Sequence, residues 1–336
     1  FRNVTGVQTC ALPISGQNER LLFTRRVLER RGINPGTEAG RLATTAFFED
    51  AVRTMVREYD DYFRDPAVGA TLFRTRGLSS DTSIYAAYAV DRTLEDLKAQ
   101  GMLRTGAVSR VAIIGPGLDF AEKQEGVDFY PVQTIQPFTV VDSLRRLQLA
   151  ASAAMVMTTF DLSPRINDHL AAAKRTAAQG RAYMLQLPRD VKQPWEPALV
   201  AYWEGLGNRI GAAATPIQAP ASLSNVRMRA VAVRPDVVAT ITPEDVNIVL
   251  QRPDPLPDDE RFDLIIATNI LIYYDVFEQS LALTNISRML APGGLLLTNN
   301  PLFELPDIPM RAIGGTKVTY MTGAGDGVVW YQRDRD

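Results

Sequence analysis

The chain has 336 residues, of which 46% are hydrophobic, so it can bury one large core or two modest ones. Its formal net charge at pH 7 is −2, which excludes the overall positive field of a typical nucleic-acid binding protein, and we expect no nucleic-acid partner. No apolar run reaches the roughly 18–20 residues that a membrane span needs. We therefore expect a soluble, cytoplasmic protein.

The chain contains one cysteine, Cys10, which excludes an internal disulfide framework. Cys10 lies in the run VTGVQTCALPI at 4–14, which resembles the translated sequence of a common sequencing adapter. We interpret residues 1–16 as a non-native artefact and expect the native N-terminus to be missing. The remaining chain has one histidine, His169, and no cysteine, so we expect no metal site.

Residues 17–105 are predicted to form a helical N-terminal section. Apolar residues recur every three or four positions in 19–32, 45–63 and 79–103, and no strand pattern interrupts them. Tyr85 and Tyr88 lie on the last of these helices. We expect them to pack in the core; closing over a cofactor is the alternative.

From 106 to 336 the pattern alternates between strands and helices, which is typical of a parallel α/β sheet. Strands are predicted at 111–114, 154–161, 181–188, 227–235, 244–251, 262–268 and 295–299, with helices at 134–151, 165–180 and 277–290. Residues 317–333 read as two short strands joined by a glycine-rich loop, which is a hairpin. The predicted fold is a doubly wound, mostly parallel seven-stranded sheet ending in an antiparallel hairpin.

Residues 188–225 do not fit the alternation and are predicted to be an insertion in this domain. They contain one amphipathic helix, expected around 195–210, followed by a tract rich in Ala and Pro. Long insertions are often functional, but plain surface segments are also common. If the insertion is a lid, then Trp195, Tyr202 and Trp203 indicate an apolar or aromatic small molecule beneath it.

The first predicted strand ends in Gly115, Pro116 and Gly117. In open parallel sheets, ligands bind outside the carboxyl ends of the strands. Glycine at such an end lets a ligand approach the backbone closely, although two glycines could also simply make a tight turn. The next strand ends in Asp161, followed by Leu162.

A carboxylate at the position of Asp161 can accept both hydroxyl protons of a ribose, and it can also cap the following helix. A carboxylate suited to a ribose, together with glycines that let a ligand approach the backbone, indicates an adenosine-containing cofactor. A dinucleotide site needs a third glycine, but position 120 is Phe, which weighs against NAD. S-adenosylmethionine has no pyrophosphate and needs only the glycine turn and the carboxylate.

Two further segments place side-chain amides at the edge formed by the carboxyl ends of the predicted strands. Asn247 lies in the predicted strand 244–251, and Asn269 follows the predicted strand 262–268. Asn269 could alternatively only cap the next turn.

The motifs VAIIGPGLDF, MTTFDLSPRINDHLAAA, RFDLIIATNILIYYD and RMLAPGGLLLTN, with the terminal hairpin, resemble class I methyltransferases that use S-adenosylmethionine. The resemblance covers roughly 106–335, apart from the insertion, and implies a Rossmann-like fold and S-adenosylmethionine as cofactor. Within it, residues 244–275 resemble the chemotaxis-receptor glutamate methyltransferases. That closer likeness implies that Asn247 with Ile248, and Asn269 with Ile270, line the cofactor pocket.

The chain departs from that closer family at Thr268, where the family has an arginine, and in the residues after the first strand. We therefore expect a small-molecule acceptor rather than a receptor, although a protein acceptor stays open. Methyl transfer is an in-line displacement, for which the protein mainly positions nucleophile and methyl. Tyr273, Tyr274 and Asp275 are the nearest candidates for acceptor contacts, with packing as the alternative for the tyrosines.

Two other functions stay open. One is a non-catalytic protein that keeps the fold as an S-adenosylmethionine or nucleoside sensor; the other is an NAD-linked oxidoreductase. Asp142 is expected on the surface, and His169 on the exposed side of a helix with neither a catalytic nor a metal-binding role.

Overall fold

The computed structural model describes residues 25, 28–29, 32–64, 84–119, 130–150, 155–219, 221, 224–254 and 256–335. The chain divides into two compact units, Phe1–Gly77 and Leu78–Asp336, and each is considered by itself. The expected artefact at 1–16 lies outside the described residues, as does most of the helix expected at 19–32.

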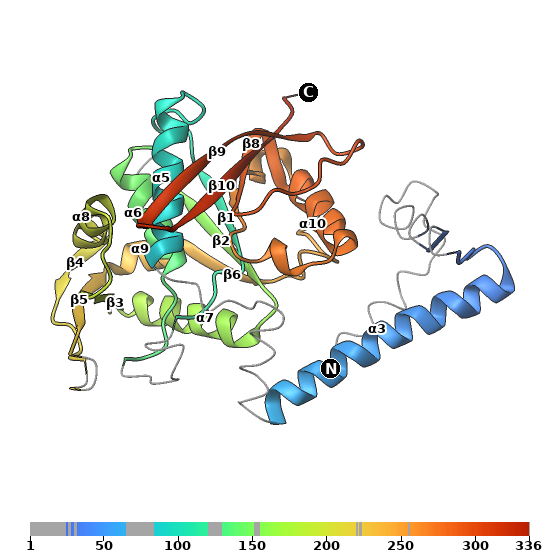
Figure 1. Ribbon diagram of the computed structural model, residues 1–336, viewed down its shortest axis with the longest axis horizontal. Coiled ribbons are helices and arrows are strands. Elements are labelled where there is room, and N and C mark those ends of the chain that lie inside the picture. The colour runs from blue at the N-terminus through green and yellow to red at the C-terminus, as the bar shows by residue number, and fades with distance from the viewer. Residues whose placement is uncertain are drawn as a thin grey trace. The chain divides into compact units, whose positions relative to one another are not determined.

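The described part of the first unit is dominated by one long helix, α3 (Glu38–Arg64) (Figure 1). The Thr37 hydroxyl accepts the N–H of Gly40 at 3.0 Å, and Glu38 places a negative charge in the first turn. Both features stabilise a helix N-terminus, where backbone N–H groups lack partners. The helix expected at 45–63 is confirmed.

The second unit is built on a seven-stranded sheet. In spatial order its strands are β6 (Ile241–Asp245), β2 (Val156–Asp161), β1 (Arg110–Ile114), β7 (Phe262–Ile266), β8 (Leu290–Thr298), β10 (Ala324–Arg333) and β9 (Met310–Met321). The first five run parallel, whereas β10 is antiparallel to both β8 and β9. The predicted mostly parallel sheet with a terminal antiparallel hairpin is confirmed.

Helices cover both faces of this sheet. They are α5 (Ile84–Ala99), α6 (Gln136–Arg146), α7 (Pro164–Ala178), α9 (Pro235–Ala239) and α10 (Val276–Met289), with single 3₁₀ turns η2 (Asp258–Glu260) and η3 (Leu271–Tyr273). The chain moves toward the β6 edge through β1–α6–β2 and toward the β9 edge through β7–α10–β8. Because both crossovers are right-handed, α6 and α10 lie on opposite faces of the sheet. Figure 1 shows α10 on the other side of the sheet from α5 and α6.

The apolar residues of the central strands β1 and β7 are buried. Val111 to Ile114 of β1 are all buried, and its neighbour β7 contributes Leu264, Ile265 and Ile266 with no exposed surface. A strand covered by helices on both faces has no solvent-facing side, which explains the continuous apolar run instead of alternation.

A second, smaller sheet departs from the sequence prediction. The strands expected at 181–188 and 227–235 do form, as β3 (Tyr183–Asp190) and β5 (Val226–Val233), but they pair antiparallel with each other and not with the main sheet. With β4 (Gly211–Ala214) they make a three-stranded sheet in the order β3-β5-β4. The helix α8 (Pro197–Gly205) confirms the helix expected around 195–210. Periodicity identifies a strand but not the sheet that it joins.

Two other predictions are corrected. The strand expected at 244–251 ends at Asp245, and Asn247–Leu250 form a turn. The helix α5, expected to belong with the N-terminal section, is part of the second unit and packs against β9, β10 and α6. Its residues Leu94 and Leu97 have no exposed surface.

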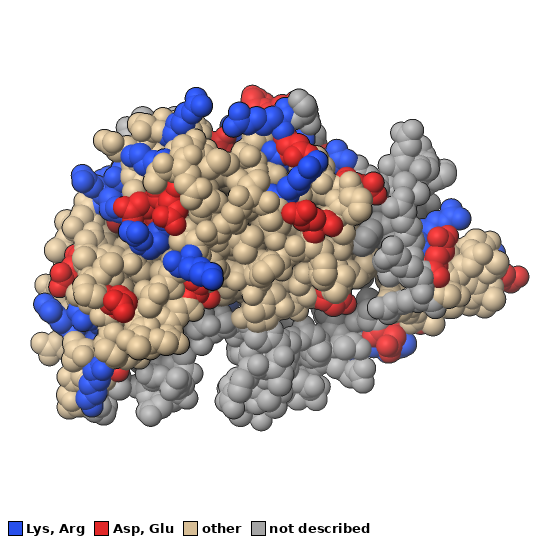
Figure 2. Space-filling view, turned by 45° about the horizontal axis from the view of Figure 1, so that its top comes forward, with Lys and Arg blue, Asp and Glu red and all other residues tan. Residues whose placement is uncertain are grey.

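On the face of the molecule in Figure 2, Lys and Arg lie interspersed with Asp and Glu, and broad uncharged areas separate the charged groups. Within the described part of the chain, no helix combines the length and hydropathy needed to cross a membrane.

Candidate functional site

The turn after β1 needs glycine for two reasons. Gly115 and Gly117 have φ angles of +68° and +66°, which residues with a side chain rarely adopt. A Cβ on Gly115 would also lie 3.2 Å from Cδ1 of Ile270. The Ile270 side chain therefore lies close to the Gly115 backbone and joins the turn after β1 to the corner after β7.

Asp161 ends β2 and carries the most perturbed carboxyl of this edge. One carboxylate oxygen accepts the N–H of Ser163 at 2.8 Å, so Asp161 does support the start of α7. Burial raises its pKa to about 6, the N–H groups of Ser163 and Leu162 lower it in part, and the charge of Asp245 raises it further. Asp245 is the direct neighbour of Asp161 across the β2–β6 pair.

The turn after β6 is fixed from within the chain. The Asn247 side-chain oxygen accepts the N–H groups of Val249 at 3.0 Å and Leu250 at 3.2 Å. The Asn285 amide on α10 donates to the carbonyls of Ile248 and Val249. Ile248 is only 2% exposed, so its side chain offers almost no surface to a ligand.

The corner after β7 is held from both sides. Asn269 has a φ of +56°, in the left-handed region where a residue with a side chain is uncommon. Its backbone N–H donates to Oδ1 of Asn299 at 2.9 Å, and the Asn299 amide donates back to the Asn269 side-chain oxygen. On the other side, the Gln136 amide donates to the Thr268 hydroxyl at 2.8 Å.

The residues expected on the acceptor side differ in role. Asp275 is the N-cap of α10 in a capping box with Glu278: its carboxylate accepts two N–H groups, and Glu278 accepts the Asp275 N–H. Burial raises the pKa of Tyr274 to about 12, helped by the charges of Glu278 and Asp161. Tyr273 ends the 3₁₀ turn η3 and is half-buried.

Four of these residues, Gly115, Asp161, Ile270 and Tyr274, are brought together at this edge of the sheet. Ile114 pairs with Phe160 across β1 and β2, so Gly115 and Asp161 leave neighbouring strands side by side. Ile270 contacts Gly115, and Tyr274 is close enough to Asp161 for that charge to raise its pKa. Asn247 instead belongs to a turn tied to α10 through Asn285. Pro116 is buried, whereas Leu162 is 53% exposed.

Sequence reasoning missed a buried polar network just beyond the glycine turn. Asp119 is 4% exposed and accepts the Tyr130 hydroxyl at 3.1 Å and the Gln133 amide at 2.9 Å. The Gln133 amide also donates to the Gln186 carbonyl at 2.7 Å, which links the turn to the small sheet. These amides lie far apart in sequence, so no local pattern pairs them.

Two residues are more deeply placed than expected. Asp142, predicted on the surface, is 3% exposed and accepts the N–H groups of Gly207 and Arg209, and burial raises its pKa. His169, predicted on an exposed side, is half-buried with Nε2 at 2.7 Å from the Tyr183 hydroxyl. Both predictions were wrong because segments distant in sequence, the loop after α8 for Asp142 and the strand β3 for His169, cover the helix faces that a sequence pattern leaves open.

Tyr85 and Tyr88 confirm the packing prediction. Tyr88 is 5% exposed within the core, and the Tyr85 ring lies 5.4 Å from Trp195 and 4.8 Å from Tyr320.

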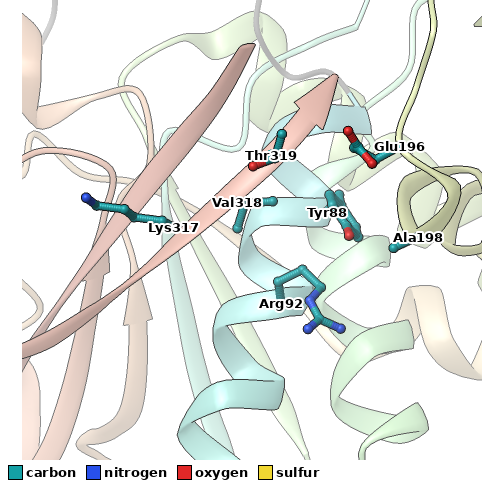
Figure 3. Close-up of a pocket in the computed structure, with 7 residues that line it drawn as sticks. All are labelled: Tyr88, Arg92, Glu196, Ala198, Lys317, Val318 and Thr319. Atoms are coloured by element: carbon teal, nitrogen blue, oxygen red, sulfur yellow. The ribbon is translucent and has the colours of Figure 1, made fainter. Parts of the chain in front are cut away.

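A shallow pocket of about 380 Å³ lies elsewhere, between α5, the start of α8 and β9 (Figure 3). It is lined by Tyr88, Arg92, Glu196, Ala198, Lys317, Val318 and Thr319. Arg92 is paired with Glu95, and Figure 3 shows the Lys317 side chain extending away from Arg92 and Glu196. Its charges do not converge, and none of its residues follows a parallel strand, so the pocket is not part of the candidate site. In the described part of the chain, no cluster of His, Cys, Asp and Glu could hold a metal ion.

No family model and no curated protein matches the chain. Among solved structures, it is similar to the N-methyltransferase NodS from Bradyrhizobium japonicum WM9, with 14% identity over 73% of this chain and 94% of that one, and a TM-score of 0.35. It is also similar to magnesium protoporphyrin IX methyltransferase (ChlM) from Synechocystis PCC 6803, with bound SAM, at 12% identity over 80% and 96% of the two chains and a TM-score of 0.37. A putative Zn-dependent alcohol dehydrogenase from Rhodobacter sphaeroides matches at 14% identity over 57% and 40%, with a TM-score of 0.27. At these scores the likenesses assign neither a function nor a ligand.

Proposed function

We propose that the protein transfers a methyl group from S-adenosylmethionine to a small-molecule acceptor. The observation that carries this proposal is the convergence of Gly115, Asp161, Ile270 and Tyr274 at the carboxyl ends of β1, β2 and β7. The seven-stranded sheet with its antiparallel end is the fold that the methyltransferase resemblance implies. Ligands of open α/β sheets bind at this edge.

The residues present fit an adenosine-containing cofactor in their chemistry. The half-buried Asp161 carboxylate is an acceptor for ribose hydroxyl protons, and the exposed apolar Leu162 beside it suits the flat face of a base. Gly115, Pro116 and Gly117 would carry the methionine portion, and Asn269 with Ile270 the adjoining wall. Asn247 and Ile248 would contribute through the backbone and the Asn247 amide, because Ile248 is buried.

When bound, S-adenosylmethionine supplies an electrophilic methyl on a sulfonium, so the protein's own residues mainly have to orient the acceptor. With a pKa of about 12, Tyr274 keeps its proton at neutral pH. It would therefore orient an acceptor oxygen or nitrogen as a hydrogen-bond donor and would not act as a base. The Asp275 carboxylate is engaged by two N–H groups of α10, which leaves Tyr273 and Tyr274 as the stronger acceptor-side candidates.

Isothermal titration with S-adenosylmethionine, S-adenosylhomocysteine and NADH tests this proposal. We expect binding of both sulfur compounds and none of NADH. If neither sulfur compound binds, the proposal fails. Tight binding of S-adenosylhomocysteine with no methylated product across broad acceptor panels would favour a non-catalytic sensor.

A further inference from the structure

Three arginines of the small sheet gather around one buried indole. Arg189 on β3 pairs directly with Arg227 on β5, and Arg229 lies two residues further along β5. Cross-strand partners and alternate residues share one face of a sheet, so all three side chains leave the same face. Their guanidinium carbons lie 5.7, 5.8 and 5.2 Å from the ring of Trp203 on α8.

The rest of that face is apolar. Leu185 and Leu187 of β3 and Val231 and Val233 of β5 are buried at its other end, and Trp203 has no exposed surface. One end of this face therefore consists of buried apolar side chains, and the other end carries three cations. We refer to Arg189, Arg227 and Arg229 as the arginine cluster; it lies on the small sheet formed by β3, β4 and β5 in Figure 1.

Among the described residues, the cluster forms no ion pair with a carboxylate, since none of the three arginines has a carboxylate oxygen within 4.0 Å. Like charges placed directly opposite on a sheet repel, as Arg189 and Arg227 must. The indole ring attracts each cation through a cation–π interaction, but it carries no net negative charge.

The three arginines differ in what they donate to. Arg229 donates to the carbonyls of Trp203 and Leu206 at the end of α8, where a cation is favourable, and the charges of Glu204 and Asp142 also act on it. Within the described residues, the side chains of Arg189 and Arg227 have no hydrogen-bond partner, and Nε of Arg189 is shielded from solvent as well. A shielded N–H without an acceptor is unfavourable unless a ligand supplies one.

We propose that the arginine cluster binds the phosphate group of a small molecule. The guanidinium fork of arginine matches a phosphate in geometry and can donate two parallel hydrogen bonds. A dianion balances two of the three charges, which a carboxylate cannot do. Arg189 and Arg227 are the ligands, Arg229 holds α8 in place beneath them, and the indoles of Trp203 and Trp195 wall the site.

The test is a calorimetric titration of the full chain with inorganic phosphate and with pyrophosphate at constant ionic strength. Wild-type protein binds saturably, and Arg227→Gln and Arg189→Gln each weaken binding by about tenfold or more, as loss of a charged hydrogen bond does. Arg181→Gln is the matched control, because Arg181 is exposed and lies just before β3. This substitution makes the same change in charge and should leave phosphate binding unchanged. Arg227 is exposed, so its variant keeps the fold even if Arg189→Gln does not, and thermal unfolding checks this.

Three results would overturn the proposal. The first is the absence of saturable binding to the wild-type protein, which would leave the arginines as a cover for Trp203. The second is an equal loss in Arg181→Gln and Arg227→Gln, which would indicate a diffuse charge effect. The third is much tighter binding of a short single-stranded RNA, lost in the same variants, which would make the cluster a nucleic-acid contact.

Discussion

The corner after β7 and the arginine cluster are both polar, but they are built in opposite ways. At the corner, Asn269 is paired in both directions with Asn299, and Thr268 accepts the amide of Gln136. In the cluster, Arg189 and Arg227 face each other, and among the described residues no carboxylate oxygen lies within 4.0 Å of either. The corner satisfies its own polar groups, whereas the cluster leaves charge for a ligand to satisfy.

The difference predicts where substitutions act. Removing a partnered group exposes the group left behind, so it lowers stability and disturbs position at the same time. Removing an unpartnered cation relieves repulsion, so it lowers only ligand affinity. Asp161 lies between these extremes, because it supports α7 and also carries a raised pKa.

The largest effect is expected at Asp161. Asp161→Ala removes the acceptor proposed for the ribose and should weaken S-adenosylhomocysteine binding by about 2–3 kcal/mol, on the order of 30- to 150-fold in Kd. Calorimetry measures this directly. Asp245→Asn is the matched control, since Asp245 is the exposed cross-strand neighbour and has no proposed ligand. Unchanged affinity in Asp161→Ala would remove the ribose from this position.

The second effect is on pH dependence. Ribose binding needs the carboxylate, so affinity should rise through pH 6 and be about tenfold lower at pH 5 than at pH 8. The stability of the ligand-free protein has the opposite pH dependence. The folded-state pKa lies above the ordinary 3.8, so between about pH 4 and 6 the folded state holds the extra proton, and this contribution to the free energy of unfolding falls as pH rises.

Asp245→Asn sharpens that experiment. Removing the neighbouring charge should lower the Asp161 pKa and move the midpoint of cofactor affinity to lower pH. A midpoint that stays in place, or affinity that is flat between pH 5 and 8, would contradict the assignment of the titration to Asp161.

The same contrast explains how much could be predicted. The order of strands and helices in the main sheet follows from buried apolar runs such as Val111–Ile114, which need no distant partner to be recognised. The glycine turn and Asp161 could also be predicted, because both lie at the ends of parallel strands and such ends share one edge of the sheet. The separate pairing of β3 with β5 was not, since the same run of alternating residues suits either sheet.

What sequence reasoning missed depends on long-range pairing. Asn299 and Gln136 hold the corner, yet each lies at least 30 residues from its partner, and an isolated amide carries no pattern. Asp142 and His169 were misplaced for the same reason, because the loop after α8 and the strand β3 bury them. The arginine cluster is visible only after β3 and β5 are paired.

Asn299→Ala tests whether the corner is a preorganised part of the site. It leaves the Asn269 N–H without its acceptor, so the free energy of unfolding in urea should fall by about 1–2 kcal/mol, and S-adenosylhomocysteine affinity by about five- to tenfold. Asn269→Gly, which tolerates the +56° φ but lacks the side chain, completes a double-mutant cycle. Coupled effects are expected for residues in contact, whereas additive ones would show that Asn299 acts independently of Asn269.

The smallest effect is expected at Asp275, which separates support of the fold from contact with an acceptor. Asp275→Ala breaks the capping box of α10 and should lower the free energy of unfolding by about 1 kcal/mol, whereas Asp275→Asn keeps a good N-cap and should stay near wild type. Affinity for S-adenosylhomocysteine should be unchanged in both variants, because the carboxylate is committed to α10. If Asn costs as much as Ala, then the charge at the helix N-terminus, and not the cap geometry, stabilises α10. If either variant loses affinity for S-adenosylhomocysteine, then Asp275 contributes to the cofactor site as well as to the N-cap of α10.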